Sequence, residues 1–218
     1  PSLDQMWLGS TAYWRDNSRG VATEHTGYTS TMKLWKEAPN KYPGWEGYTA
    51  FETWKFKEDN PIATEASGGT PAQAPSRQVG TGQAPASLIT FNFWDMPGFG
   101  VKWEYLTEEK LYKRYQGGQV HVDAGADNTP LKAKNVILQF TKETAFNDQK
   151  NHLNYETIGS GDAKIFMDGK VIDATWRKPE IRERTRFYDA TGREIRFNRG
   201  QIWIEVVPAS KSGTVEIS

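Results

Sequence analysis

The sequence predicts an α+β fold, in which a mixed sheet with few short helices is followed by a β-rich C-terminal module of hairpins. Stretches of alternating apolar and polar residues recur from residue 88 onward. Turn residues, often glycine, separate these stretches at short intervals. We expect an incomplete N-terminal α+β part over residues 1–129 and the β-rich module over residues 130–218.

The clearest helical pattern in the N-terminal part is short. Residues 30–38 predict a helix because Thr29 or Ser30 can cap its N-terminus and Pro39 stands just past its expected end. Residues 53–57 alternate as a strand does.

Residues 60–87 form a low-complexity segment with almost no large apolar side chains. Such a segment cannot bury enough surface to offset the entropy lost on ordering. It is either a linker between domains or a long excursion from one domain. We favour the excursion, because strand-like sequence resumes directly after it.

The middle of the chain predicts strands. Residues 88–94 and 99–105 alternate on either side of a Pro-Gly turn at residues 97–98, which indicates a hairpin. Residues 107–115 fit either a capped helical turn or a third strand. Residues 133–141 are the most apolar run in the chain and predict a buried strand.

The tail carries the strongest local signal. Residues 162–167 and 170–176 flank an Asp-Gly pair, which suits the positive φ angles of a two-residue hairpin turn. Residues 184–188 and 193–197 predict a second hairpin, and residues 201–207 a final strand. This spacing predicts a small barrel or a curled sheet.

Composition excludes several classes of protein. The 27 basic and 27 acidic residues cancel, so no long-range field attracts the chain to nucleic acid. No apolar run reaches the roughly 20 residues of a membrane span, and we expect no membrane contact within this chain. The absence of cysteine excludes disulfides, thiolate metal sites and thiol nucleophiles.

Histidine chemistry has few places to occur, because the chain has three histidines. His121 and Asp123 share one face if the segment is extended, and such a pair can orient an imidazole or bind a metal. His25 could approach the same pair. We favour the simpler interpretation, a histidine satisfied by a nearby carboxylate or carbonyl at a domain junction. We therefore expect no metal site, no cofactor and no assignable catalytic residue.

Basic residues near the histidine segments could hold an anionic ligand through forked hydrogen bonds. The alternative is ordinary surface charge, and packing against apolar neighbours would explain the aliphatic stems. The candidate ligand-binding residues are Arg15, Arg19, His25, Tyr28, Lys33, Arg114, His121 and Asp123.

The many aromatic residues admit glycan binding, because rings with a polar edge suit interfaces that are half apolar. We expect Trp176 and Trp203, which lie within strands, to fill the core instead. The tryptophans to test for sugar binding lie in loop-like surroundings and are Trp7, Trp14, Trp45 and Trp94.

Residues 177–186 alternate in charge sign. This pattern favours a solvated loop or a sheet edge that resists strand addition over a phosphate site.

Several motifs occur along the whole chain in a definite order: residues 24–35, 112–115, 121–123, 131–137, 159–169, 175–176 and 200–208. In their residues and in their order along the chain, these motifs resemble those of the YerB-like family of bacterial lipoproteins, whose members have an uncharacterised two-part domain. The resemblance implies an extracytoplasmic protein of unknown activity, held at the cell membrane by a lipid anchor on a precursor segment.

The chain departs from the family pattern in two places. The family's first part opens with a longer segment than this sequence supplies, so we expect the N-terminal portion to be missing here. Residues 60–87 also look longer than the family's connection. We expect the partner to be either the missing segment as a separate chain or another envelope protein. We expect the ligand to be a glycan or a small anion.

The leading functional hypothesis is a non-enzymatic binding or scaffolding domain of the bacterial cell envelope, with its ligand near the candidate residues. One alternative is an envelope enzyme acting on cell-wall polymer. Another is a structural subunit completed by a partner chain. The residues themselves leave open whether the protein is an enzyme.

Overall fold

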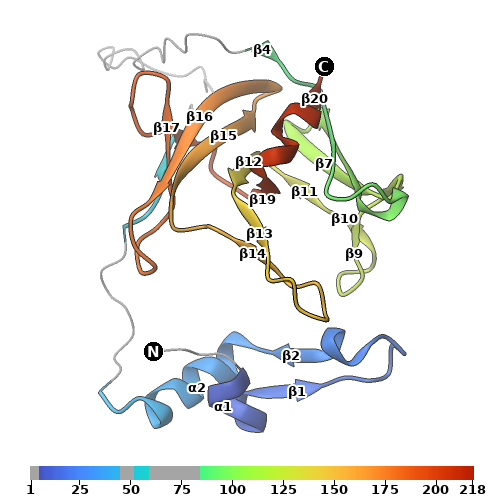
Figure 1. Ribbon diagram of the computed structural model, residues 1–218, viewed down its shortest axis with the longest axis vertical. Coiled ribbons are helices and arrows are strands. Elements are labelled where there is room, and N and C mark those ends of the chain that lie inside the picture. The colour runs from blue at the N-terminus through green and yellow to red at the C-terminus, as the bar shows by residue number, and fades with distance from the viewer. Residues whose placement is uncertain (1–4, 45–51, 59–83) are drawn as a thin grey trace, which may run out of the picture. The chain divides into compact units, whose positions relative to one another are not determined.

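The computed structural model describes residues 5–44, 52–58 and 84–218 (Figure 1). The protein is mostly β-structure with few short helices, as predicted in outline. The chain divides into two compact units, Pro1–Glu52 (unit 1) and Thr53–Ser218 (unit 2), and this division differs from the boundary predicted at residue 129. Among the described residues, no helix is long and apolar enough to cross a membrane.

The described part of unit 1 contains a two-stranded ribbon, two short α-helices and one 3-10 turn. The predicted helix is present and begins after Ser30, whose side chain accepts a hydrogen bond from the Lys33 N–H at 3.3 Å. Its predicted end is wrong, because Pro39 lies inside the helix. Proline removes one donor there, but the Tyr42 N–H still bonds the Ala38 carbonyl at 2.9 Å and closes the last turn. The elements are α1 (Gln5–Ala12), β1 (Tyr13–Arg15), η1 (Thr23–His25), β2 (Gly27–Thr29) and α2 (Thr31–Lys41).

The first sheet of unit 2 has the order β11-β7-β6-β5-β20, with β8 paired to β7. The hairpin predicted from residues 88–105 is confirmed as β5 and β6. The ambiguous residues 107–115 contain a strand, which follows a turn where Lys110 has a φ of 54°. The elements of this sheet are β5 (Leu88–Asn92), β6 (Gly100–Leu106), β7 (Leu111–Gln116), β8 (Gln119–Val120), β11 (Lys132–Ala133) and β20 (Glu216–Ile217).

The second sheet has the order β17-β16-β15-β12-β19, with β4 paired to β16. Its β15–β16 hairpin is confirmed, with positive φ angles at Asp168 and Gly169. The predicted strand over residues 133–141 is confirmed as β12, in which all residues are buried. The elements are β4 (Ala84–Pro85), β12 (Asn135–Thr141), β15 (Gly159–Met167), β16 (Lys170–Lys178), β17 (Arg186–Asp189) and β19 (Ile202–Pro208).

Shorter elements connect and flank the two sheets. The predicted second hairpin turns back after β17, where the Asp189 N–H bonds the Arg193 carbonyl at 2.9 Å. Its return segment continues into β18, which pairs in parallel with β3. These elements are β3 (Lys55–Phe56), η2 (Pro97–Phe99), β9 (Val122–Asp123), β10 (Thr129–Pro130), β13 (Glu143–Ala145), β14 (Leu153–Tyr155), β18 (Arg196–Phe197) and η3 (Ala209–Thr214).

The end of the predicted low-complexity excursion belongs to unit 2. Residues 60–83 lie outside the described residues. Ala84–Pro85 pairs with β16, and Ala86 is buried with its N–H bonded to the Gly169 carbonyl at 2.9 Å. Residues 84–86 are thus ordered by backbone pairing, for which their small side chains are sufficient.

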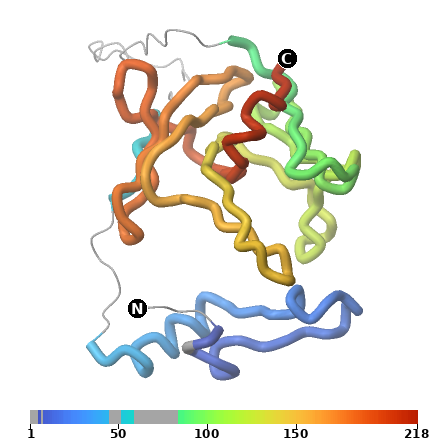
Figure 2. Tube along the Cα trace, in the orientation of Figure 1, coloured from blue at the N-terminus to red at the C-terminus, as the bar shows by residue number. Residues whose placement is uncertain are grey.

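Two hydrophobic clusters stabilise unit 2. The first joins both sheets and includes Trp103, Leu138 and Phe166. The second lies on the other side of β12 and β15–β16 and includes Trp176 and Phe187. The prediction that Trp176 and Trp203 fill the core is confirmed, since Trp176 is buried and Trp203 packs against the first cluster. Figure 2 shows the red C-terminal end beside the green segment that contains β5.

Candidate functional site

Arg114, on β7, is the centre of a buried polar cluster in unit 2. Its side chain is 4% exposed, and its Nε donates to Oε1 of Glu205 at 2.9 Å. Its Nη1 donates to Oε1 of Gln116 at 2.7 Å and lies 2.5 Å from Nδ1 of His121. A buried cation is tolerated when it is paired and hydrogen-bonded in this way.

Two tryptophan rings enclose this cluster. The Arg114 Cζ lies 5.8 Å from the centroid of the Trp103 ring and 5.1 Å from that of Trp203. The Trp103 indole N–H donates to Glu205 Oε1 at 3.2 Å. The guanidinium and the carboxylate are therefore occupied by partners inside the protein.

His121 is held beside Arg114 by both backbone and side chain. Its N–H bonds the Arg114 carbonyl at 3.0 Å. Arginine can only donate, so Nδ1 of His121 accepts and the neutral ring carries its proton on Nε2. Burial lowers the pKa of His121, and the charge of Arg114 lowers it further, while Glu205 acts in the opposite direction. The imidazole is thus a neutral acceptor at pH 7.

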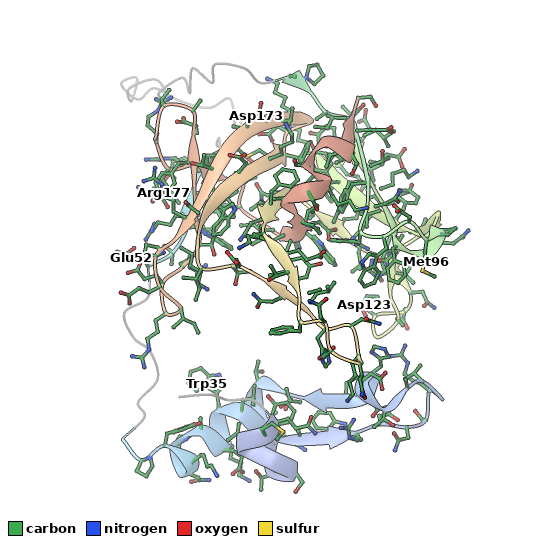
Figure 3. The ribbon with its side chains drawn as sticks, viewed as in Figure 1. Trp35, Glu52, Met96, Asp123, Asp173 and Arg177 are labelled. Carbon is green, nitrogen blue, oxygen red and sulfur yellow. The ribbon has the colours of Figure 1, made fainter. Side chains whose placement is uncertain are left out.

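Asp123 is exposed and is the last residue of β9, where the turn toward β10 begins (labelled in Figure 3). Its Oδ1 accepts a hydrogen bond from the Gly125 N–H at 2.8 Å, which is a local turn contact. The structure therefore brings Arg114 and His121 together and assigns Asp123 to its own turn. Within residues 5–44, 52–58 and 84–218, no three His, Asp or Glu side chains gather as a metal ion would require.

The candidate residues of unit 1 lie on and around the β1–β2 ribbon. Arg15 Nη1 donates to the Thr23 carbonyl at 2.5 Å and to Oγ1 of Thr26 at 3.1 Å, so it braces the loop of this ribbon. His25 is exposed at the end of η1.

An aromatic surface with two cations is formed by the β1–β2 ribbon, its loop and the first turn of α2. Trp14 and Tyr28 are cross-strand neighbours, with ring centroids 6.3 Å apart and planes 26° from parallel. Lys33 Nζ lies 4.3 Å from the Trp14 ring centroid, and Arg19 Nη1 donates to the Tyr28 hydroxyl at 3.2 Å. The Trp14 side chain is 40% exposed. We call Trp14, Arg19, Tyr28 and Lys33 the Trp14 surface.

The other tryptophans proposed for sugar binding have different surroundings. Trp94 is exposed and packs edge to face against Phe99, with centroids 4.5 Å apart. Trp45 and the side chain of Trp7 lie outside the described residues.

The eight candidate residues thus fall into two groups. Five belong to unit 1 and three to unit 2. Sequence reasoning missed Glu205, the partner of Arg114. A signal was present, because Glu205 is an isolated acid in the apolar run of residues 201–207, where an inward-facing charge needs an internal partner.

A sequence comparison identifies the family of the chain. The C-terminal domain of a protein family of unknown function, DUF3048, matches residues 89–204, which is more than half of the chain. The chain belongs to this family. The DUF3048 match begins in β5 and ends in β19, so it takes strands from both sheets and includes Arg114 and His121.

The fold of this DUF3048 chain is similar to a solved structure. The crystal structure of the YerB protein from Bacillus subtilis matches with a TM-score of 0.69 and 17% sequence identity. The alignment covers 98% of this chain and 62% of the Bacillus protein. The predicted YerB-like resemblance is confirmed. A comparison with curated proteins found no match.

Proposed function

We propose that the protein is a non-enzymatic binding domain of the bacterial cell envelope, which recognises an acidic glycan through the Trp14 surface. The observation that carries this proposal is the exposed Trp14 ring, stacked near Tyr28 and accompanied by Lys33 and Arg19.

The chemistry of the Trp14 surface suits a ligand that is apolar on one face and charged on its edge. Broad aromatic rings provide contact area at low entropic cost. Lysine and arginine beside the rings can pair with carboxylate or phosphate groups. A sugar polymer with acidic substituents combines both requirements.

The polar cluster of unit 2 fits a structural role better than it fits catalysis. A general acid or base must reach a substrate proton. Arg114, Glu205 and His121 instead form bonds with one another between tryptophan rings. This arrangement supports a rigid structural role for the cluster.

The envelope location is part of the proposal and rests on the family resemblance set out above. The same applies to lipid anchoring through a precursor segment. Fractionation of cells that produce the full precursor tests both, since an anchored protein sediments with membranes and detergent releases it.

Co-sedimentation with purified peptidoglycan sacculi tests the proposed ligand. Trp14→Ala should reduce the bound fraction about tenfold, as loss of an aromatic anchor commonly does. Trp35→Ala is the matched control, because Trp35 is an exposed tryptophan of the same unit, and it should retain binding. Equal losses in both variants, or no binding by the unaltered protein, would contradict the proposal.

The supernatants of the same experiment test the enzyme alternative. A binding domain releases no soluble fragments from the sacculi. Release that is lost in a folded His121→Ala variant would overturn the non-enzymatic assignment in favour of cell-wall cleavage.

A further inference from the structure

Four basic residues of unit 2 lie on adjacent strands in one line. They are Lys55 on β3, Arg177 on β16, Arg186 on β17 and Arg196 on β18. We call them the cation row. Figure 3 labels Arg177 on β16.

The strand register defines the row. Arg177 is the direct cross-strand partner of Arg186, and Lys55 that of Arg196. The Tyr188–Glu194 bridge and the Ile195 N–H bond to the Phe187 carbonyl set the pairing of the segment after β17. Continued by one residue, this pairing places Arg196 opposite Arg186.

The four cations share the outward side of their strands. Their chain neighbours Trp176, Phe187 and Phe197 are buried in the second hydrophobic cluster. Successive side chains of a strand point to opposite sides. The neighbours therefore anchor the strands, and the side chains of the cation row lie on the solvent side.

One carboxylate is shared by the row. Glu194 accepts from Lys55 Nζ at 2.8 Å and from Arg186 Nη1 at 2.7 Å. Burial raises the pKa of Glu194, but the hydrogen bonds and the positive charges of Lys55 and Arg186 together lower it below its ordinary value, so the group is ionised at neutral pH. Within the part of the chain that the structure describes, Arg177 and Arg196 have no carboxylate partner.

This arrangement places positive charge against positive charge in a protein whose net charge is zero. Like charges directly opposite each other on neighbouring strands are destabilising. Residues 52–58 and 177–199 together hold ten Lys and Arg against six Asp and Glu. An anion lying along the row would remove the repulsion that the fold maintains.

We propose that the cation row binds a polyanion, a chain molecule that carries phosphate or carboxylate groups at intervals. Neighbouring strands are about 4.8 Å apart, so four strands span about 15 Å, enough for several charged groups. Three of the four residues are arginines, whose guanidinium matches both kinds of oxyanion. This site is separate from the Trp14 surface and does not depend on it.

The observations favour a polyanion other than nucleic acid. Single-stranded nucleic acid binding usually requires aromatic rings on which bases stack. Tyr188, the ring beside the row, already has the Arg177 guanidinium 5.3 Å from its centroid.

Titration with inorganic polyphosphate at low salt, followed by calorimetry, tests the proposal. The double variant Arg177→Gln with Arg196→Gln should bind at least about tenfold more weakly and with a shallower salt dependence. The charge-matched control is Lys110→Gln with Lys150→Gln, two exposed turn residues outside the strands of the row, and it should bind within about twofold of the unaltered protein. Poly-γ-glutamate in place of polyphosphate distinguishes carboxylate from phosphate recognition.

Several results would overturn the proposal. The first is an equal loss of polyphosphate affinity in the control double variant. The second is that the unaltered protein binds neither polyanion, and the third is that it binds single-stranded DNA more tightly than polyphosphate. Melting curves of both double variants verify folding. Trp14→Ala should leave polyphosphate binding unchanged, so failure of the glycan proposal and failure of this one are distinguishable.

Discussion

Arg114 and Glu205 form an ion pair that connects the two sheets of unit 2. The Nε to Oε1 distance is 2.9 Å, and neither side chain is more than 6% exposed. Arg114 belongs to β7 of the first sheet and Glu205 to β19 of the second. The pair therefore fixes how the sheets face each other, and its two tryptophan neighbours exclude water from it.

Removing one member of this pair should be costly. Glu205→Leu leaves the guanidinium buried without its carboxylate, and we expect a loss of about 3–5 kcal/mol in the free energy of unfolding. Arg114→Met combined with Glu205→Leu should recover most of it, because no charge is then left buried. Urea denaturation measures both.

An exposed ion pair provides the control for that experiment. Lys142 and Glu156 lie 2.9 Å apart with side chains 66% and 47% exposed. Lys142→Ala should change the free energy of unfolding by less than about 1 kcal/mol. Equal losses in the single and double core variants would show that the ion pair does not account for the effect.

Acid should destabilise unit 2 through His121. Because burial and Arg114 lower its folded pKa, the unfolded chain binds the proton more tightly. The contribution of neutral His121 to the free energy of unfolding is therefore fully present above pH 6.5, the ordinary histidine pKa. It is lost as the pH falls from there through the folded pKa. His121→Gln keeps an acceptor for Arg114 and should make the free energy of unfolding less dependent on pH in this range. An NMR titration in which His121 protonates above pH 6.5 would refute the assignment.

Gly161 should not tolerate a side chain. A Cβ there would lie 2.7 Å from the Trp176 indole nitrogen and 2.9 Å from the Phe140 carbonyl oxygen, which bond each other at 2.8 Å. We expect Gly161→Ala to cost about 1–3 kcal/mol by overpacking. A Cβ at Gly213 meets no atom within 4 Å, so Gly213→Ala should have a Tm close to that of the unaltered protein. Thermal melts compare the two variants.

Relief of repulsion in the cation row should stabilise the protein. Arg196→Gln removes the charge opposite Lys55 and should raise the free energy of unfolding by about 0.2–1 kcal/mol. This corresponds to a Tm increase of about 1–3 °C at low salt. The increase should shrink in high salt, where exposed charges are screened. A lower Tm at low salt would mean that Arg196 stabilises the fold and that the row is not repulsive.

Local signals predicted the elements that depend on neighbours in sequence. The β15–β16 hairpin follows from its alternation and from Asp168-Gly169, because this turn is specified by two residues. Residues 107–115 stayed ambiguous, because Thr107 followed by acidic residues resembles a helix cap as much as a turn. Pairing with β6 and β11 decides in favour of a strand.

Long-range pairing could not be predicted in the same way. The parallel pairing of β12 with β19 has no turn to specify it. Arg114 and His121 are only seven residues apart in the sequence, but Glu205 is 91 residues from Arg114. The cation row also appears only in the folded register, because along the sequence its residues alternate with acids.

The most direct test of the binding account is the set of tryptophan indole N–H signals, recorded by NMR while soluble peptidoglycan fragments are added. The account predicts that the Trp14 signal moves progressively and that the buried Trp103 and Trp176 signals stay in place. A stationary Trp14 signal at saturating fragment concentration would contradict it.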